Sequence, residues 1–263
     1  MGDTVRIEVA ERIATVTLDD PSTLNACGVD TAESLHAIVR AIDAGEHDVG
    51  AVVLTGAGRA FCSGANLTNS PGRSDSAEPA DLGRGLETAY NPLMTALRDL
   101  RVPLVTAVNG AAAGIGCSIA LMGDLIVAGE SAYFLQAFRR IGLVPDGGAT
   151  WMLPRMIGRA RAMEMTLLGE KLPAAMALEW GLVNRVVPDA KLITAAMDCA
   201  RKLADGPASL GLTRKLVLAA ESAGWEDQLT AERLAQREAG RTTDFVEGVQ
   251  AFFQKRPAKF TGK

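Results

Sequence analysis

Residues 104–128, with the sequence LVTAVNGAAAGIGCSIALMGDLIVA, connect two apolar runs through a glycine-rich turn and a short helical pattern. The runs at 104–108 and 125–128 are continuously apolar, which is typical of parallel strands that are covered on both faces. A third run of this kind, AVVLT, lies at 51–55, and helical patterns separate the three runs. Strands and helices that alternate in this way predict an α/β architecture with central strands and outer helices.

The two ends of the chain predict different structures. Residues 5–18 alternate between apolar and polar side chains on both sides of Glu11-Arg12, and this alternation predicts a β-hairpin. After Val187, amphipathic helical patterns follow one another at 190–204, 208–222, 226–238 and 243–254. We therefore divide the chain into an α/β core, residues 1–200, and a helical C-terminal region, residues 201–263.

The composition argues against several classes of protein. The net charge of −4 comes from 27 basic and 31 acidic residues, so it gives no reason to expect a nucleic-acid partner. The N-terminus lacks the apolar core of a secretory signal, and no apolar run approaches the roughly 18 residues of a membrane span. We therefore expect a cytoplasmic protein without a membrane partner.

Cysteine and histidine are scarce and scattered. The four cysteines, at positions 27, 62, 117 and 199, form neither a CxxC pair nor a short cluster with histidine. We expect them to be reduced and mostly buried rather than to form disulfides or a metal site. The two histidines, His36 and His47, lie outside the glycine-rich turns, so histidine-based catalysis is not expected.

Three glycine-rich segments follow strand patterns, and two of them imitate well-known motifs. Residues 55–67, TGAGRAFCSGANL, begin like a dinucleotide-binding fingerprint, but Phe61 replaces its third glycine. Residues 116–120, GCSIA, resemble a nucleophile elbow around Ser118. An esterase triad requires a histidine downstream of the serine, and both histidines lie upstream. We therefore expect neither a dinucleotide site at residues 55–67 nor a nucleophilic serine at Ser118.

The third glycine-rich segment, residues 141–155, contains a lone acidic residue. Asp146 stands between Pro145 and two glycines, before a helical pattern that begins at residue 149. Taken alone, an aspartate in this place is typical of a turn or a helix cap.

Together these segments resemble the crotonase (enoyl-CoA hydratase/isomerase) superfamily over essentially the whole chain. Several long motifs stand in the order expected for that family, namely FCSGANL at 61–67, VNGAAAGIGCSIALMGDLIVA at 108–128, IGLVPDGGATWMLPRMIGRARAMEMTLLGE at 141–170, ALEWGLVNRVVP at 177–188 and FFQKRPAKF at 252–260. Within the superfamily, the FLQAF, GLVPD and RARAM segments are most similar to isomerase members, of the 1,2-epoxyphenylacetyl-CoA and enoyl-CoA isomerase kinds.

The resemblance implies a crotonase-like spiral of ββα repeats, followed by a helical C-terminal region used for trimer assembly, often as a dimer of trimers. It also implies an acyl-CoA substrate, with coenzyme A entering as part of that substrate and with no separate cofactor. The chemical step common to the family stabilises the anion that develops on the thioester oxygen. By position, the two backbone N–H donors for this anion are those of Ala65 and Ile115.

The resemblance further assigns residues to substrate binding. The channel for coenzyme A would be lined by Leu24, Asn25, Ala26, Ser63, Asn66, Leu67, Thr68 and Gly114. The acyl pocket would be shaped by residues 68–90 and the C-terminal helices, and the polar stretch 68–85 is either a lid or a disordered insertion. The basic tail, with Lys255, Arg256 and Lys259, is expected to supply charge for the phosphates unless it is simply a solvated terminus.

The acid and base residues decide which reaction is catalysed. Hydratases of the family carry two glutamates, and in this sequence their positions fall on Ser118 and Phe138. Neither side chain can act as a carboxylate base. Asp146 instead falls where several isomerases of the family carry the carboxylate that moves the proton.

These positions lead to the hypothesis of an acyl-CoA isomerase that uses Asp146. We expect Leu143, Val144 and Trp151 to desolvate this carboxyl group and to raise its pKa toward a useful value. Two alternatives stay open. One is an enoyl-CoA hydratase that recruits water through Asp146 alone, and the other is a catalytically silent acyl-CoA-binding protein.

Overall fold

The hairpin predicted for residues 5–18 forms one edge of the larger of two sheets. The computed structural model describes residues 4–66 and 81–263, and in it β1 (Val5–Ala10) pairs antiparallel with β2 (Ile13–Leu18). The two turn residues, Glu11 and Arg12, have left-handed φ angles of 49° and 59°. Two such residues in succession give a turn whose twist matches that of the flanking strands, so the predicted hairpin is confirmed.

The three continuous apolar runs form the middle of the same sheet. The strand order is β1-β2-β3-β5-β7-β10, and the pairs from β2 onward are parallel. The further strands of this sheet are β3 (Ala51–Gly56), β5 (Leu104–Val108), β7 (Leu125–Gly129) and β10 (Arg185–Val187). Every residue of β5 is buried, as expected for a strand with helices on both faces of the sheet.

A second sheet, in the order β4-β6-β8-β9, takes up the short strands that follow the long ones. Its strands are β4 (Ala60–Cys62), β6 (Ala111–Ala113), β8 (Tyr133–Leu135) and β9 (Leu172–Pro173). Because β3, β5 and β7 each lead into one of these strands and then into helical structure, the chain builds the ββα repeats that the resemblance implied. Strands of two or three residues are too short to show alternation, so the sequence pattern alone did not predict them.

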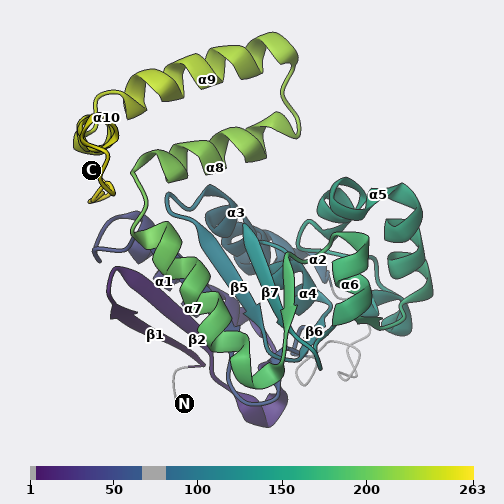
Figure 1. Ribbon diagram of the computed structural model, residues 1–263. Helices are drawn as coiled ribbons and strands as arrows, with labels where there is room; N and C mark the ends of the chain where they lie inside the picture. Colours follow the sequence, from purple (N-terminus) through teal and green to yellow (C-terminus); the bar gives the residue numbers. More distant parts are fainter. Residues whose placement is uncertain (1–3, 67–80) are drawn as a thin grey trace.

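Each face of the six-stranded sheet packs against helices, and Figure 1 shows α7 (Leu192–Ala204) lying across one of them. In β3, Ala51 and Val53 join the apolar cluster that includes α7, whereas Val52 and Leu54 join the larger cluster on the other face. The remaining core helices are α1 (Val29–Asp43), α2 (Gly83–Gly85), the π-helix η3 (Leu86–Tyr90), α3 (Asn91–Asp99), α4 (Ile115–Ala120), α5 (Ala149–Leu168) and α6 (Ala174–Trp180).

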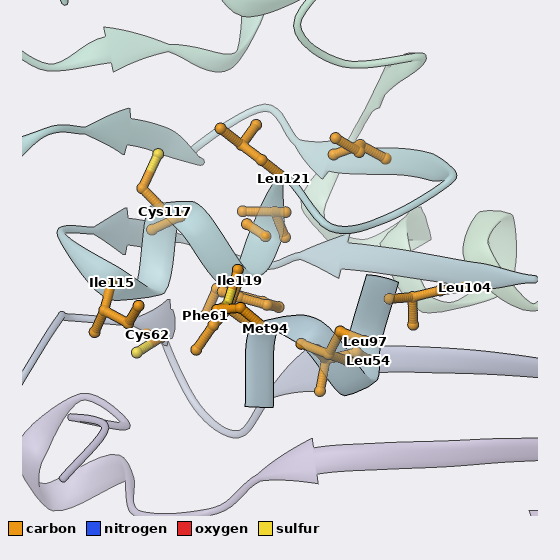
Figure 2. Close-up of a cluster of buried hydrophobic side chains, with 14 of the residues drawn as sticks. Leu54, Phe61, Cys62, Met94, Leu97, Leu104, Ile115, Cys117, Ile119 and Leu121 are labelled. Carbon is orange, nitrogen blue, oxygen red and sulfur yellow. The ribbon is translucent and has the colours of Figure 1, made fainter. Parts of the chain in front are cut away.

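The larger cluster connects the sheet to the glycine-rich turns. Figure 2 shows part of it, with Leu97 of α3 and Leu104 of β5 toward one end and Ile115 beside Cys62 at the other. All four of these side chains are almost completely buried. The start of α4 is therefore fixed by close packing rather than held by a mobile loop.

The C-terminal region consists of helices that extend away from the sheet. They are α8 (Ser209–Ala220), α9 (Trp225–Ala239) and α10 (Thr243–Gln254), close to the predicted ranges. Figure 1 shows α8 and α9 as a pair of helices projecting above the sheet. In the described ranges 4–66 and 81–263, every helix is too short or too polar to cross a membrane.

The side chain of Arg214 anchors α8 to the core. Its guanidinium group forms an ion pair of 2.7 Å with Asp124 and donates to the backbone oxygens of Leu97, Arg98 and Leu100, which end α3. The Arg214 side chain is only 4% exposed and that of Asp124 is 24% exposed. A charge pair removed from water in this way depends on both of its partners.

Replacing Arg214 by alanine is expected to lower the free energy of unfolding by about 3–5 kcal/mol, because it leaves the carboxylate of Asp124 buried without its cation. The measurement is urea unfolding at a fixed protein concentration. The control is Arg201→Ala, which removes exposed ion pairs with Asp198 and Glu11 and should lower the free energy of unfolding by less than about 1 kcal/mol. Equal costs for the two variants would show that Arg214 is not a structural anchor.

Candidate active site

Two glycine turns meet where β4 and β6 end. Gly64 and Gly114 have φ angles of 110° and 53°, a conformation that residues with a side chain rarely adopt. A methyl group on Gly64 would lie 3.1 Å from the carbonyl oxygen of Ala113, and one on Gly114 would lie 3.8 Å from the Cα atom of Gly64. The two glycines therefore allow the backbones of these turns to pass close to one another.

The residues that follow these glycines are Ala65 and Ile115, the predicted anion donors. Ile115 is the first residue of α4, and amides of the first helical turn have no acceptor within the helix. Ala65 forms an isolated parallel bridge with Cys27. Within the described part of the chain, neither the Ala65 amide nor the Ile115 amide donates a hydrogen bond to the protein.

Residues 24–27 run alongside the first of the two turns. The Ser63 amide donates to the Leu24 oxygen at 3.0 Å, and the Cys27 amide donates to the Gly64 oxygen at 2.8 Å. The structure thus brings together two of the predicted substrate-binding segments, with Ala26 half-buried between them. Predicted residues 67–68 lie outside the described residues, as does most of the stretch 68–85.

The side chain of Asn25 forms hydrogen bonds with the backbone of neighbouring turns. It is almost fully buried, and its Nδ2 atom donates to the backbone oxygens of Ala57 and Ala60 at 2.9 and 2.7 Å. Its Oδ1 atom accepts from the Asp20 amide. Asn25 therefore joins two turns, so any contribution that it makes to a ligand site comes through its main chain.

The turn that carries Asp146 packs against α4. The hydroxyl group of Ser118 donates to the backbone oxygen of Asp146 at 2.9 Å. A methyl group on Gly147 would lie only 2.5 Å from the Cδ1 atom of Ile115, which shows how closely this turn approaches the start of the helix. The third glycine-rich segment is thus brought to the other two.

The Asp146 carboxyl group is partly removed from water. Burial raises its pKa to about 6, and its Oδ1 atom is buried without a hydrogen-bond partner among the described residues. Its charge contributes to the raised pKa values of Tyr90 and Cys27, for which burial is the main cause, so these three groups lie near one another. The predicted direction of the pKa shift is confirmed.

The predicted source of this desolvation is wrong in part. Val144 and Leu143 are 80% and 40% exposed, so they do not form the apolar cover that the sequence suggested. Both precede Asp146 in a segment that turns toward the surface, whereas Tyr90 comes from a different helix. A run of apolar neighbours does not show which of them faces inward.

The two hydratase positions carry no carboxylate in this site. Ser118 is fully buried, and its hydroxyl group is engaged with the Asp146 backbone. Phe138 is 7% exposed, and a methyl group on Gly114 would lie 3.8 Å from its Cζ atom. An aromatic ring therefore faces the second glycine turn at the position where the resemblance places a hydratase glutamate.

Tyr90 is a residue of this site that the sequence analysis missed. It ends the π-helix η3, is 8% exposed, and its hydroxyl group donates to the backbone oxygen of Cys27 at 2.8 Å. The apolar spacing of residues 86–100 is compatible with one regular helix, so this spacing gives no sign that Tyr90 ends a separate helical segment. The signal that could have revealed it is Pro92, which lies in the first turn of α3 and marks a break in the helical pattern.

The basic tail is partly engaged in structure. Arg256 forms two hydrogen bonds with the carboxylate of Glu247, at 2.6 and 2.8 Å, and lowers the pKa of that carboxyl group to about 2. Its charge is therefore balanced within the subunit. Of the three cations expected to serve phosphates, Lys255 and Lys259 are the ones not held in this way.

All four cysteines are buried and none forms a disulfide. Cys27 and Cys62 lie behind the first glycine turn, Cys117 is inside α4, and Cys199 lies on α7 on the other face of the sheet. In the part of the chain that the structure describes, no three His, Cys, Asp or Glu side chains are grouped in the way that a metal ion would require.

Comparisons with known proteins agree on one family. A family model described as enoyl-CoA hydratase/isomerase matches residues 8–263. The 1,2-epoxyphenylacetyl-CoA isomerase of Escherichia coli is 42% identical over 265 residues, which cover 100% of both chains. A protein of Rhodobacter capsulatus named as a probable enoyl-CoA hydratase is 43% identical over 261 residues, covering 99% of this chain and 98% of that protein.

Solved structures give the same result for the fold. The enoyl-CoA hydratase of Bacillus anthracis superposes with a TM-score of 0.89 at 28% sequence identity, over 99% of this chain and 100% of that chain. The Escherichia coli isomerase and the probable hydratase of Rhodobacter capsulatus are 42% and 43% identical to this chain, so sequence identity does not distinguish the two activities.

Proposed function

The chain belongs to the enoyl-CoA hydratase/isomerase family and has the crotonase fold, and from this premise we propose that it is an acyl-CoA isomerase that moves a proton with Asp146. Two features found together support isomerisation. Asp146 is half-buried and has a pKa of about 6, and the two positions where a hydratase carries glutamates are occupied by Ser118 and Phe138. A carboxyl group with such a pKa can take up a proton and return it near neutral pH.

The proposed reaction is a shift of the double bond in a 3-enoyl-CoA. The Asp146 carboxylate removes a proton from C2, and the electron pair moves through C1 to the thioester oxygen. The N–H groups of Ala65 and Ile115 donate to this oxygen while it carries the negative charge. The carboxyl group then returns the proton to C4, which leaves the double bond between C2 and C3 and restores the carbonyl group.

Coenzyme A would lie along the paired segments described above. The adjacent backbones of residues 24–26 and 63–66 support this proposal because they lead to the first glycine turn. Gly114 would face the thioester across that turn.

The rate of the proposed reaction should depend on the ionisation of Asp146. Because the base must be ionised and its pKa is about 6, kcat/KM is expected to be constant at higher pH and to fall about tenfold per pH unit below about 6. The measurement is the initial rate with a 3-enoyl-CoA from about pH 4.5 to pH 8.5. A rate that rises as the pH falls through this range would exclude a carboxylate base.

The experiment that tests the function is incubation with three substrates in deuterated water. A 3-enoyl-CoA, a 2-enoyl-CoA and epoxyphenylacetyl-CoA are supplied separately, and product masses and spectra are recorded. An isomerase shifts the double bond and exchanges label without net addition of water. A gain of one water by the 2-enoyl-CoA would favour the hydratase alternative, which the Rhodobacter capsulatus relative suggests.

A catalytically silent binding protein would bind these thioesters and convert none of them. Asp146 forms no ion pair among the described residues, and its backbone oxygen accepts a hydrogen bond from Ser118 of the helix that begins at Ile115. An aspartate kept only for stability would instead be expected to have its buried oxygen paired. This arrangement supports the enzyme over the silent protein.

We further propose that the protein is a homotrimer or a dimer of trimers, and we expect a trimeric or hexameric mass in solution. Large apolar side chains of the C-terminal helices are exposed in the single subunit, among them Trp225 at 73%, Phe252 at 78% and Phe253 at 77%. Exposed apolar area of this kind marks surfaces that other subunits cover. Light scattering at micromolar concentration measures the mass, and a monomer would contradict the proposal.

A further inference from the structure

A cavity of about 820 Å³ lies between α8 and the core. Its walls come from α3, the end of α4, the first turns of α5 and the inner side of α8. Most of the lining side chains are apolar, and they include Met94, Met122, Met152 and Met156. Methionine side chains adapt their shape to an apolar ligand, and the volume lies within the range of sites that enclose a drug-sized molecule.

The cavity adjoins the Asp146 turn on two sides. Gly147 and Gly148 follow Asp146 directly and form part of the cavity wall. A methyl group on Gly148 would point toward Met152, at 3.8 Å from its Cε atom, so the glycine leaves this part of the cavity open. On the other side, Tyr90 lies close to the Asp146 carboxylate. Met94, which lines the cavity, follows Tyr90 by one helical turn.

Of the charged side chains that line the cavity, Arg214, Asp124 and Arg98 have partners, whereas Glu221, directly after α8, forms no ion pair among the described residues. Arg214 and Asp124 neutralise one another at 2.7 Å. Arg98 and Arg155 lie against the ring of Trp151, with their guanidinium carbons 5.2 and 4.1 Å from its centre. Because most of the lining is apolar, the cavity favours an apolar ligand over an ionic one.

We infer that this cavity holds the acyl group of the thioester and that the enzyme therefore prefers long or bulky apolar acyl groups to short ones. The inference rests on the proposed function, which places the thioester oxygen at the two glycine turns. The reacting carbons then lie at Asp146, and the remainder of the acyl group extends past Gly147 and Gly148 toward the methionines. One wall of this compartment is α8, so the C-terminal region takes part in substrate choice.

The test compares unbranched 3-enoyl-CoA substrates of 4, 6, 8 and 10 carbons. Each additional buried methylene should raise kcat/KM about fourfold until the cavity is filled. In parallel, calorimetry measures the Kd of saturated acyl-CoA thioesters of the same lengths, which cannot isomerise. The Kd should fall in the same order, and this part of the test does not depend on catalysis.

Two variants fill the cavity from opposite walls. Met156→Trp enlarges a side chain on α5, and Val217→Trp does so on α8, where a 64% exposed residue tolerates the larger ring without loss of folding. Both should lower the ratio of kcat/KM for 10 carbons to that for 4 carbons by at least about tenfold. The control is Met163→Trp, on α5 but outside the cavity and 45% exposed, which should leave the ratio unchanged.

The outcomes separate this inference from the proposed function. Isomerisation that is independent of chain length, or variants that affect short and long substrates alike, would overturn the inference and leave the isomerase standing. Chain-length-dependent binding without isomerisation would support the cavity assignment and overturn the isomerase. A Val217→Trp variant that changes the mass of the oligomer but not the selectivity would overturn the inference by identifying the cavity as a subunit contact.

Discussion

An Asp146→Asn variant is expected to turn over a 3-enoyl-CoA at least roughly a hundredfold more slowly than the wild type, with a smaller effect on KM. Asparagine keeps the size and polarity of the side chain but cannot take up the proton from C2. The measurement is the rate of double-bond movement in deuterated water, followed by mass and absorbance. The variant should neither move the double bond nor incorporate label.

The matched control is Ser118→Ala, which removes the hydroxyl group that donates to the Asp146 backbone. Ser118→Ala should lower the turnover rate by at most about tenfold, because the hydroxyl group only positions the turn and carries no proton in the reaction. If the Asn variant kept near-normal turnover while Ser118→Ala abolished it, the base would be wrongly assigned.

The same Asn variant has a stability signature that confirms folding. The pKa of Asp146 is raised from 3.8 to about 6 in the folded state, so ionisation disfavours folding as the pH rises through that interval. The variant should therefore unfold at a higher temperature than the wild type at pH 7, and this difference should shrink toward pH 4. A variant that is inactive and also less stable at pH 7 would indicate misfolding rather than loss of the base.

An Ile115→Pro variant is expected to lower kcat by about a hundredfold to a thousandfold, because it removes one of the two proposed anion donors. Proline lacks the N–H group but is tolerated at the first position of a helix, which is the place of Ile115 in α4. The measurement is kcat and KM for the best 3-enoyl-CoA, with circular dichroism to verify the fold.

The matched control is Ile115→Ala, which truncates the same buried side chain and keeps the amide. Ile115 is 1% exposed, so both variants lose packing, and only the proline variant loses the donor. Similar kcat values for the two variants would show that the Ile115 amide does not stabilise the anion.

The longer helices and strands of the fold could be predicted from the sequence. The hairpin at 5–18, the apolar strands and the C-terminal helices each repeat a pattern over many residues, so local periodicity was enough. The β4-β6-β8-β9 sheet could not be predicted in the same way, because its strands are two or three residues long. The resemblance supplied the ββα repeat that these short strands complete.

The candidate site was predictable where motifs mark it and not where distant residues meet. Asp146 and the two glycine turns lie in recognisable motifs, and the structure brings them together at α4. The Tyr90–Cys27 hydrogen bond and the Arg214–Asp124 ion pair join residues 63 and 90 positions apart, which no local pattern connects. The exposure of Val144 was also unpredictable, because the direction of a turn depends on what it packs against.

The four buried thiols can be used to measure local opening of the fold. A thiol-reactive reagent reaches a buried cysteine only when the surrounding segment opens, so its modification rate in native buffer measures the free energy of that opening. Cys27 and Cys62 would report on the first glycine turn, whereas Cys199 would report on the contact between α7 and the sheet. If an added thioester slowed the modification of Cys27 and Cys62 but not that of Cys199, the ligand would stabilise the first glycine turn against opening. This measurement needs no engineered label.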